Sequence, residues 1–166
     1  MLRAVIGVIV GYAVVFILVM ISFTIAYIAM GTEGAFKDGS YEVSLTWLIT
    51  SFVIGLVAAI IAGFTCAVIA EPGSKATLVL AGIVLVVGLG MALPVLISAA
   101  DDAEPPVREG SVPNFEAMQK AEQPVIAAIL NPVIGAAGVL IGWRIRGPGE
   151  TTAKPLPANS PRTGDV

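Results

Sequence analysis

The sequence predicts an all-α membrane protein in which four transmembrane helices form an up-down bundle of two hairpins. Four apolar runs contain no Asp, Glu, Lys or Arg, and each is long enough to cross the roughly 30 Å hydrocarbon core as a helix. Only 13% of the 166 residues are charged, about half the share of roughly 25% that is usual in soluble domains. Lipid offers backbone polar groups no partner, so the runs are expected to be helical.

The first run covers residues 4–30 and is expected to be a retained span. It is far longer than the apolar core of a signal peptide, about 7–15 residues, and no suitable small-residue cleavage site follows it. The second span is expected over residues 45–70, with Ser44 as its N-cap. Trp47 then falls near the headgroups, where indole side chains are enriched.

Residues 31–44 are expected to form a first outer loop. Asp38 and Gly39 are a pair typical of tight hairpin turns. Phe36, Tyr41 and Val43 are expected either to pair across that turn or to dip into the membrane interface.

The third span is expected over residues 76–100, after a short turn at 71–75 that contains the turn pair Pro72-Gly73. So short a connection predicts that the second and third helices are antiparallel neighbours.

A second outer loop is expected over residues 101–122, with a short helix over 115–122 that Asn114 caps. Phe115 and Met118 share one face of this helix, which suits a helix lying on the membrane surface. The densest acidic cluster of the loop is expected to be solvated rather than to bind a cation; it comprises Asp101, Asp102, Glu104 and Glu109.

The fourth span is expected over residues 123–143. Too little sequence remains outside the spans for a separate soluble domain, so residues 1–146 are expected to form one transmembrane domain. Residues 147–166 are rich in Pro, Gly, Ser and Thr and lack apolar periodicity, which predicts a disordered cytoplasmic tail.

The distribution of basic residues predicts that both termini are cytoplasmic. With the N-terminus inside, six of the nine Lys and Arg residues fall on the inner side, and Arg144 and Arg146 directly follow the fourth span. Nine of the twelve acidic residues then fall outside. The short loops and Val/Ala/Gly-rich spans are similar to those of many small bacterial membrane proteins, so the expected location is the bacterial cytoplasmic membrane.

Small residues four positions apart allow membrane helices to approach closely. The candidate packing positions are Gly7, Gly11, Gly55, Ala59, Gly63, Gly138 and Gly142. They are expected to pack the helices of one bundle. The alternative is that one stripe, in the first or fourth helix, contacts another subunit.

Pro94, Asn131 and Pro132 are candidate helix breaks. Asn131 is the only carboxamide deep in a span, and a proline at position 132 frees a carbonyl about one turn earlier. Two interpretations remain open: a packed kink with Asn131 bonded to a neighbouring helix, and an opened turn that lines a polar cavity.

The spans lack the groups that catalysis and ion coupling usually need. The chain has no histidine, its one cysteine is Cys66, and no ionisable residue lies within any run. The helix count is similar to that of the small multidrug-resistance exporters, but those rely on a glutamate in the first helix, which is missing here. Nucleotide, metal and nucleophile motifs are also missing, as is a basic surface for nucleic acid. We therefore expect no enzymatic activity, cofactor, metal or nucleic acid.

The leading hypothesis is a non-catalytic accessory or structural subunit that binds a membrane-protein partner, or a second copy of itself, within the lipid bilayer. The alternative is a passive channel or uncharged-solute carrier that acts as an oligomer. Backbone carbonyls and hydroxyls are able to line such a charge-free pore.

Overall fold

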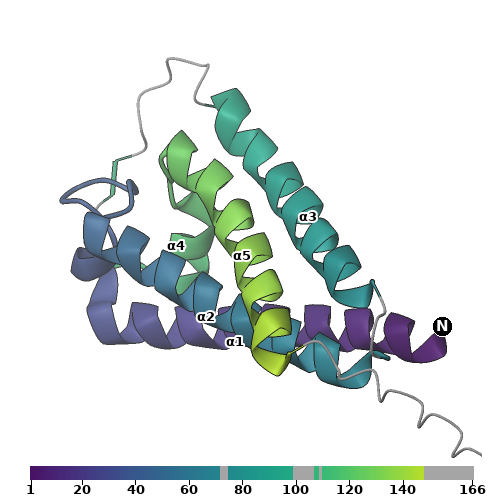
Figure 1. The fold of residues 1–166 in the computed structure, drawn as a ribbon. Helices are drawn as coiled ribbons and strands as arrows, with labels where there is room; N and C mark the ends of the chain where they lie inside the picture. Colours follow the sequence, from purple (N-terminus) through teal and green to yellow (C-terminus); the bar gives the residue numbers. More distant parts are fainter. Residues whose placement is uncertain (72–74, 99–106, 109, 148–166) are drawn as a thin grey trace, which may run out of the picture.

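The computed structural model describes residues 1–71, 75–98, 107–108 and 110–147, which form five helices (Figure 1). The long helices are α1 (Leu2–Ala35), α2 (Leu45–Ile69), α3 (Ala76–Ser98) and α5 (Val125–Arg146), and the short one is α4 (Asn114–Lys120). Each long helix is long and apolar enough to span a membrane. The predicted all-α class and the four candidate spans are therefore confirmed.

Helix α1 extends beyond its predicted span at both ends. The apolar run ends at Met30, and at Gly31 the backbone adopts φ 66° before one more helical turn reaches Ala35. Glycine accepts this positive φ without steric cost, which explains why the bend falls there. The first loop is therefore shorter than predicted. Helix α5, in contrast, is shifted along the chain: it begins two residues later and ends three residues later than predicted, running from Val125 to Arg146.

Helix α2 lies at the centre of the bundle, between α1 and α5 (Figure 1). The start of α1 meets the end of α2, where a Cβ on Gly7 would lie 3.0 Å from the Cys66 carbonyl oxygen. At the other end of this helix pair, the rings of Phe23 and Trp47 stack with centroids 5.7 Å apart.

Helix α3 packs chiefly on α5, not on α2 as the short connection suggested. Its contact with α2 includes the Thr77 hydroxyl, 3.9 Å from the Cys66 sulfur. The main contact places Gly88 of α3 against Pro132 of α5, where an added Cβ would lie 2.7 Å from the proline ring. Close approach at this glycine explains the pairing, which loop length alone does not determine. The turn residues 72–74 lie outside the described residues.

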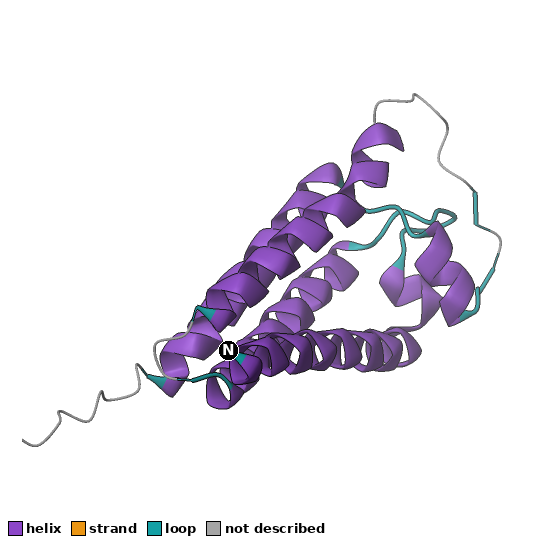
Figure 2. Ribbon diagram, turned by 90° about the vertical axis from the view of Figure 1, so that its right-hand side faces the viewer, coloured by secondary structure: helices purple, strands orange, loops and turns teal. Residues whose placement is uncertain are grey.

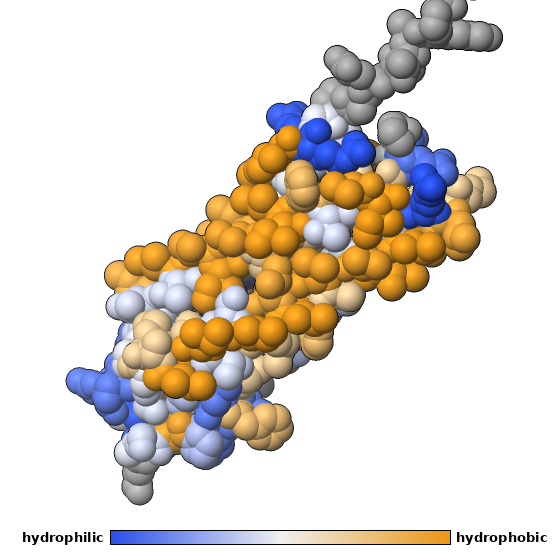
Figure 3. All heavy atoms as spheres, turned by 90° about the horizontal axis from the view of Figure 1, so that it is seen from below, coloured by the Kyte–Doolittle hydropathy of each residue, from blue (hydrophilic) through white to orange (hydrophobic). Residues whose placement is uncertain are grey.

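The four long helices converge toward the end that holds the N-terminus and spread toward the other end, where α4 and the loops lie (Figures 1 and 2). Seen from below, hydrophobic residues form a broad belt between two hydrophilic ends (Figure 3). Such a belt is the surface expected for helices that face lipid.

Candidate functional site

Two loops that are distant in the sequence fold together at the spread end of the bundle. We call this region the loop cap; it consists of residues 36–44, 107–108 and 110–124, and includes α4. The turn at Asp38-Gly39 and the pairing of Phe36 with Val43 are confirmed. The second loop joins this hairpin through short bridges from Ser40 to Val107 and from Glu42 to Glu122.

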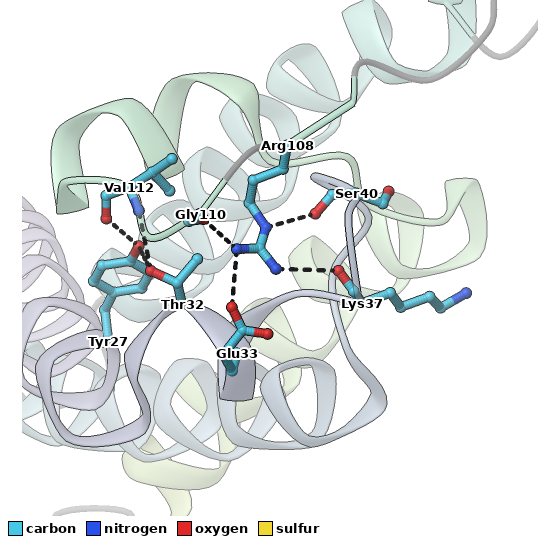
Figure 4. A network of polar contacts seen from close by, with 8 residues as sticks. All are labelled: Tyr27, Thr32, Glu33, Lys37, Ser40, Arg108, Gly110 and Val112. Atoms are coloured by element: carbon cyan, nitrogen blue, oxygen red, sulfur yellow. Dashed lines mark hydrogen bonds and ion pairs between the residues drawn. The ribbon is translucent and has the colours of Figure 1, made fainter.

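Arg108 holds the loop cap together from within (Figure 4). Its side chain is only 2% exposed. Nε donates to the Ser40 carbonyl at 3.1 Å, and one terminal nitrogen donates to the Gly110 carbonyl at 2.5 Å. The same nitrogen lies 3.1 Å from the Glu33 carboxylate, whose side chain is 70% exposed. The other terminal nitrogen lies 3.5 Å from the Lys37 carbonyl. One guanidinium therefore ties the end of α1 to both loops.

A second set of contacts ties the second loop to the last full turn of α1 (Figure 4). The Tyr27 hydroxyl donates to the Val112 carbonyl at 2.7 Å, and the Val112 amide lies 3.2 Å from the Thr32 hydroxyl. Tyr27 and Thr32 are both buried, and their oxygens are 3.1 Å apart. These contacts satisfy buried polar atoms that would otherwise be costly to remove from water.

An aromatic cluster forms the floor of the loop cap. Tyr27 meets Phe36 and Trp47 edge-on, with ring centroids 6.5 Å and 6.1 Å away. Phe36 in turn meets Tyr41 edge-on at 5.9 Å. Edge-on pairs of this kind add about 0.5–1.5 kcal/mol each beyond the area they bury. Trp47, expected near the headgroups, is thus also part of this cluster.

Of the two predicted helix caps, the structure contains the one at Ser44 but not the one at Asn114. Ser44 caps α2 as expected, because its hydroxyl accepts from the Trp47 amide at 3.0 Å. Asn114 does not cap α4: it is the first residue of that helix, Pro113 holds the N-cap position, and no side-chain cap bond forms. The Asn114 amide instead lies 3.5 Å from the Thr24 hydroxyl of α1.

Helix α4 meets the first loop through a three-residue contact. The Glu116 carboxylate accepts from the Tyr41 hydroxyl and from the Lys120 ammonium, both at 2.9 Å. The Lys120 ammonium also lies 5.2 Å from the centre of the Tyr41 ring. The hydrogen bonds from Lys120 and Tyr41 lower the pKa of Glu116, and the hydrogen bond to Glu116 raises the pKa of Lys120.

The loop cap is expected to loosen in acid, because a carboxyl with a depressed pKa stabilises the fold only while it is ionised. The contribution of Glu116 is present above its unfolded-state pKa and is lost as the pH falls through its lower folded-state pKa. Trp47 fluorescence, recorded in a Trp143→Phe background, should report this transition. The matched Glu116→Gln variant should lack it; an unchanged transition in that variant would assign it to another group.

All three ion pairs among the described residues lie at this end of the molecule: Lys37 with Glu42, Arg108 with Glu33, and Lys120 with Glu116. The opposite end carries basic residues for which the described part of the chain supplies no ion-pair partner; these are Arg3, Lys75, Arg144 and Arg146. The two ends therefore differ in how their positive charge is balanced.

The small-residue positions lie mainly within the bundle. A Cβ on Gly63 would collide with the Val139 carbonyl of α5, and one on Gly142 would collide with the Ile60 carbonyl of α2. A Cβ on Gly138 would lie 2.8 Å from the Ala59 side chain. Ala59 itself is fully buried. The backbones of α2 and α5 thus touch directly at these positions.

The same geometry separates the two glycines of α1 from Gly55. A Cβ on Gly7 or on Gly11 would approach the Cys66 region of α2, and at Gly11 it would also lie 2.7 Å from Leu80 of α3. A Cβ on Gly55 would meet no atom within 4 Å, so this position lies outside the contacts between helices.

The candidate break positions sit inside continuous helices. Helix α5 continues through Asn131 and Pro132, and Pro132 is buried against Gly88 of α3. Asn131 is half-buried, and its side-chain amide has no hydrogen bond within the described part of the chain. Pro94 lies exposed within α3. The proline at 132 therefore acts in helix packing.

Arg108 was not singled out from the sequence among the basic residues on the outer side. Its role depends on carbonyl groups about 70 positions away in the chain, and no local pattern marks such a contact. The predicted acidic cluster at 101, 102, 104 and 109 lies outside the described residues. Within the described ranges, no group of three or more His, Cys, Asp or Glu side chains is arranged to hold a metal ion.

No protein-family model matches the chain, and no curated protein or solved structure matches it significantly. Four long apolar helices with hydrophilic ends are consistent with an integral membrane protein. The loop cap is the site where its polar side chains converge.

Proposed function

We propose that this chain is a non-catalytic multi-pass membrane protein that serves as an accessory or structural subunit. The proposal rests on one observation: the buried polar side chains of the loop cap bond to other parts of the same chain. Arg108, Tyr27 and Thr32 are buried, and each holds one loop against another element. Groups committed to such contacts are positioned to hold a shape rather than to act on a substrate.

The proposal places the loop cap outside the cytoplasm and both termini inside it. Each Lys or Arg of the loop cap is paired with a carboxylate, whereas Arg3, Lys75, Arg144 and Arg146 at the other end have no ion-pair partner among the described residues. Basic residues close to the ends of membrane spans favour the cytoplasmic side, where they also meet anionic lipid at about 1 kcal/mol per residue. We place the protein in a cell membrane, with the bacterial cytoplasmic membrane as the expected one.

A partner would find open helix surface on α3. Val86 and Met91 are 70% and 75% exposed, and a Cβ on Gly82 or Gly90 would meet no atom within 4 Å. Gly63 of α2 and Gly138 and Gly142 of α5 are by contrast occupied by contacts within the bundle. A partner helix that packs on this chain is therefore expected to pack on α3.

Native mass spectrometry of the protein, purified in mild detergent from its own host membrane, tests the proposal. A reproducible heteromer supports the accessory role, and replacing Gly82 and Gly90 together with leucine should then weaken the complex. Gly55→Leu is the matched control on α2. A strictly monomeric protein contradicts the proposal. A defined homo-oligomer would favour the passive channel instead, and liposome flux with Asn131→Leu would follow.

A further inference from the structure

Helix α4 presents apolar side chains that the described part of the chain leaves uncovered. Phe115 is 72% exposed and Met118 is 50% exposed. Ala117, on another face, is buried in the aromatic cluster, while Glu116 and Lys120 turn toward Tyr41. The helix therefore packs on the first loop through Ala117 and the polar contact with Tyr41, and it leaves Phe115 and Met118 exposed beside Gln119 and Lys120.

The contacts of α4 with α1 fix its level along the bundle. Asn114, its first residue, lies against Thr24, and the Val112 carbonyl just before it accepts from Tyr27. Ile28 lies four residues beyond Thr24, or about 6 Å further along the helix. It is 74% exposed within the apolar span of α1. Helix α4 therefore begins at a level where α1 still presents an exposed isoleucine.

We infer that α4 is an interfacial helix that lies in the membrane, with Phe115 and Met118 in contact with bilayer lipid. This inference rests on the proposed membrane location. Helix α1, which α4 contacts, also exposes apolar side chains, among them Ile25 at 61% exposure. Amphipathic helices bury such a face about 5–10 Å into the boundary between headgroups and acyl chains. The bilayer then anchors the second loop, in addition to the contacts made by Arg108 and Tyr27.

Lipid-borne quenching of a fluorescent label tests the inference on the full chain. A Cys66→Ala background removes the one native thiol, and an environment-sensitive label is placed by Phe115→Cys or by Met118→Cys. Asp38→Cys, at the tip of the hairpin turn, is the control outside the bilayer. Ile25→Cys, on the exposed face of α1, is the control within it. Each protein is reconstituted in nanodiscs whose lipids carry a spin label near the headgroup end of the acyl chain.

The labels at positions 115 and 118 should be quenched several-fold more strongly than the label at 38, and to an extent similar to the label at 25. If the label at 25 is quenched while those at 115 and 118 match the label at 38, α4 lies outside the bilayer and the inference fails. Its apolar face would then be a docking surface for protein. If the label at 25 is also unquenched, the membrane location itself fails. Two independent label positions guard against a single misfolded variant.

Discussion

Replacing Arg108 with methionine is expected to separate the two loops of the cap while the four long helices stay assembled. The substitution removes the guanidinium donors from the Ser40 and Gly110 carbonyls, which belong to the two different loops. Hydrogen bonds to a charged group contribute about 1.5–3 kcal/mol each. Arg108→Met removes those to the Ser40 and Gly110 carbonyls, which are only partly buried, so we expect the contact between the loops to weaken by about 3 kcal/mol.

Hydrogen exchange measures this effect amide by amide. The Arg108 amide donates to the Gly39 carbonyl at 2.9 Å, and the Glu122 amide donates to the Tyr41 carbonyl at 2.9 Å. Both should exchange roughly a hundred-fold faster in Arg108→Met, since each 1.4 kcal/mol corresponds to tenfold. Arg108→Lys keeps the charge but loses the planar fork of the guanidinium. Its exchange rates should therefore fall between those of the unaltered protein and those of Arg108→Met. Unchanged exchange in Arg108→Met would show that the guanidinium does not hold the loops.

Replacing Gly63 or Gly142 with alanine is expected to destabilise the bundle itself. At both positions the added methyl group meets a backbone carbonyl of the facing helix, which no rotamer change is able to relieve. Overpacking of a closely packed interface costs about 1–3 kcal/mol. Because a backbone carbonyl moves less readily than a side chain, we expect the loss of stability at these two sites to lie toward the upper end of that range. The apparent melting temperature in detergent, followed by size-exclusion chromatography after heating, should therefore fall.

Gly55→Ala is the matched control for these two variants, because it lies in α2 but meets no atom within 4 Å. It should leave the melting temperature unchanged or raise it slightly, since alanine favours a helix over glycine by about 1 kcal/mol. Equal losses in all three variants would mean that the effect comes from contact with lipid or detergent and not from the contact between α2 and α5.

The long helices could be predicted because lipid imposes a simple rule on sequence. Each span needs an uninterrupted apolar run, and the four runs match the four long helices within a few residues. Two local features could also be predicted: Ser44 caps α2, and the chain turns at Asp38-Gly39. These features depend on neighbours a few residues apart, so the sequence records them directly.

The helix pairing and the loop cap could not be predicted in the same way. The contact between α3 and α5 depends on Gly88 meeting Pro132, and both residue types occur elsewhere in the spans without such a contact. Arg108 could not be singled out from the sequence because nothing near it in the chain requires its burial. Its partners, the carbonyls of Lys37 and Ser40, come from the other loop. Contacts between distant segments leave no periodic signal.

If the two loops form one folded cap, cysteines placed on paired residues of the two loops should form a disulfide. Ser40→Cys and Val107→Cys, introduced together in the Cys66→Ala background, place thiols on two residues that pair across the loops. Paired positions on adjacent strands fall within the Cα separation that a disulfide spans, about 4.4–6.8 Å. We expect rapid bond formation in native membranes, detected by peptide mapping, and slower formation when Arg108→Met is added. The pair Ser40→Cys with Arg146→Cys, which joins opposite ends of the bundle, should not react. Failure of the 40 and 107 pair to form a disulfide faster than this control would contradict the folded loop cap.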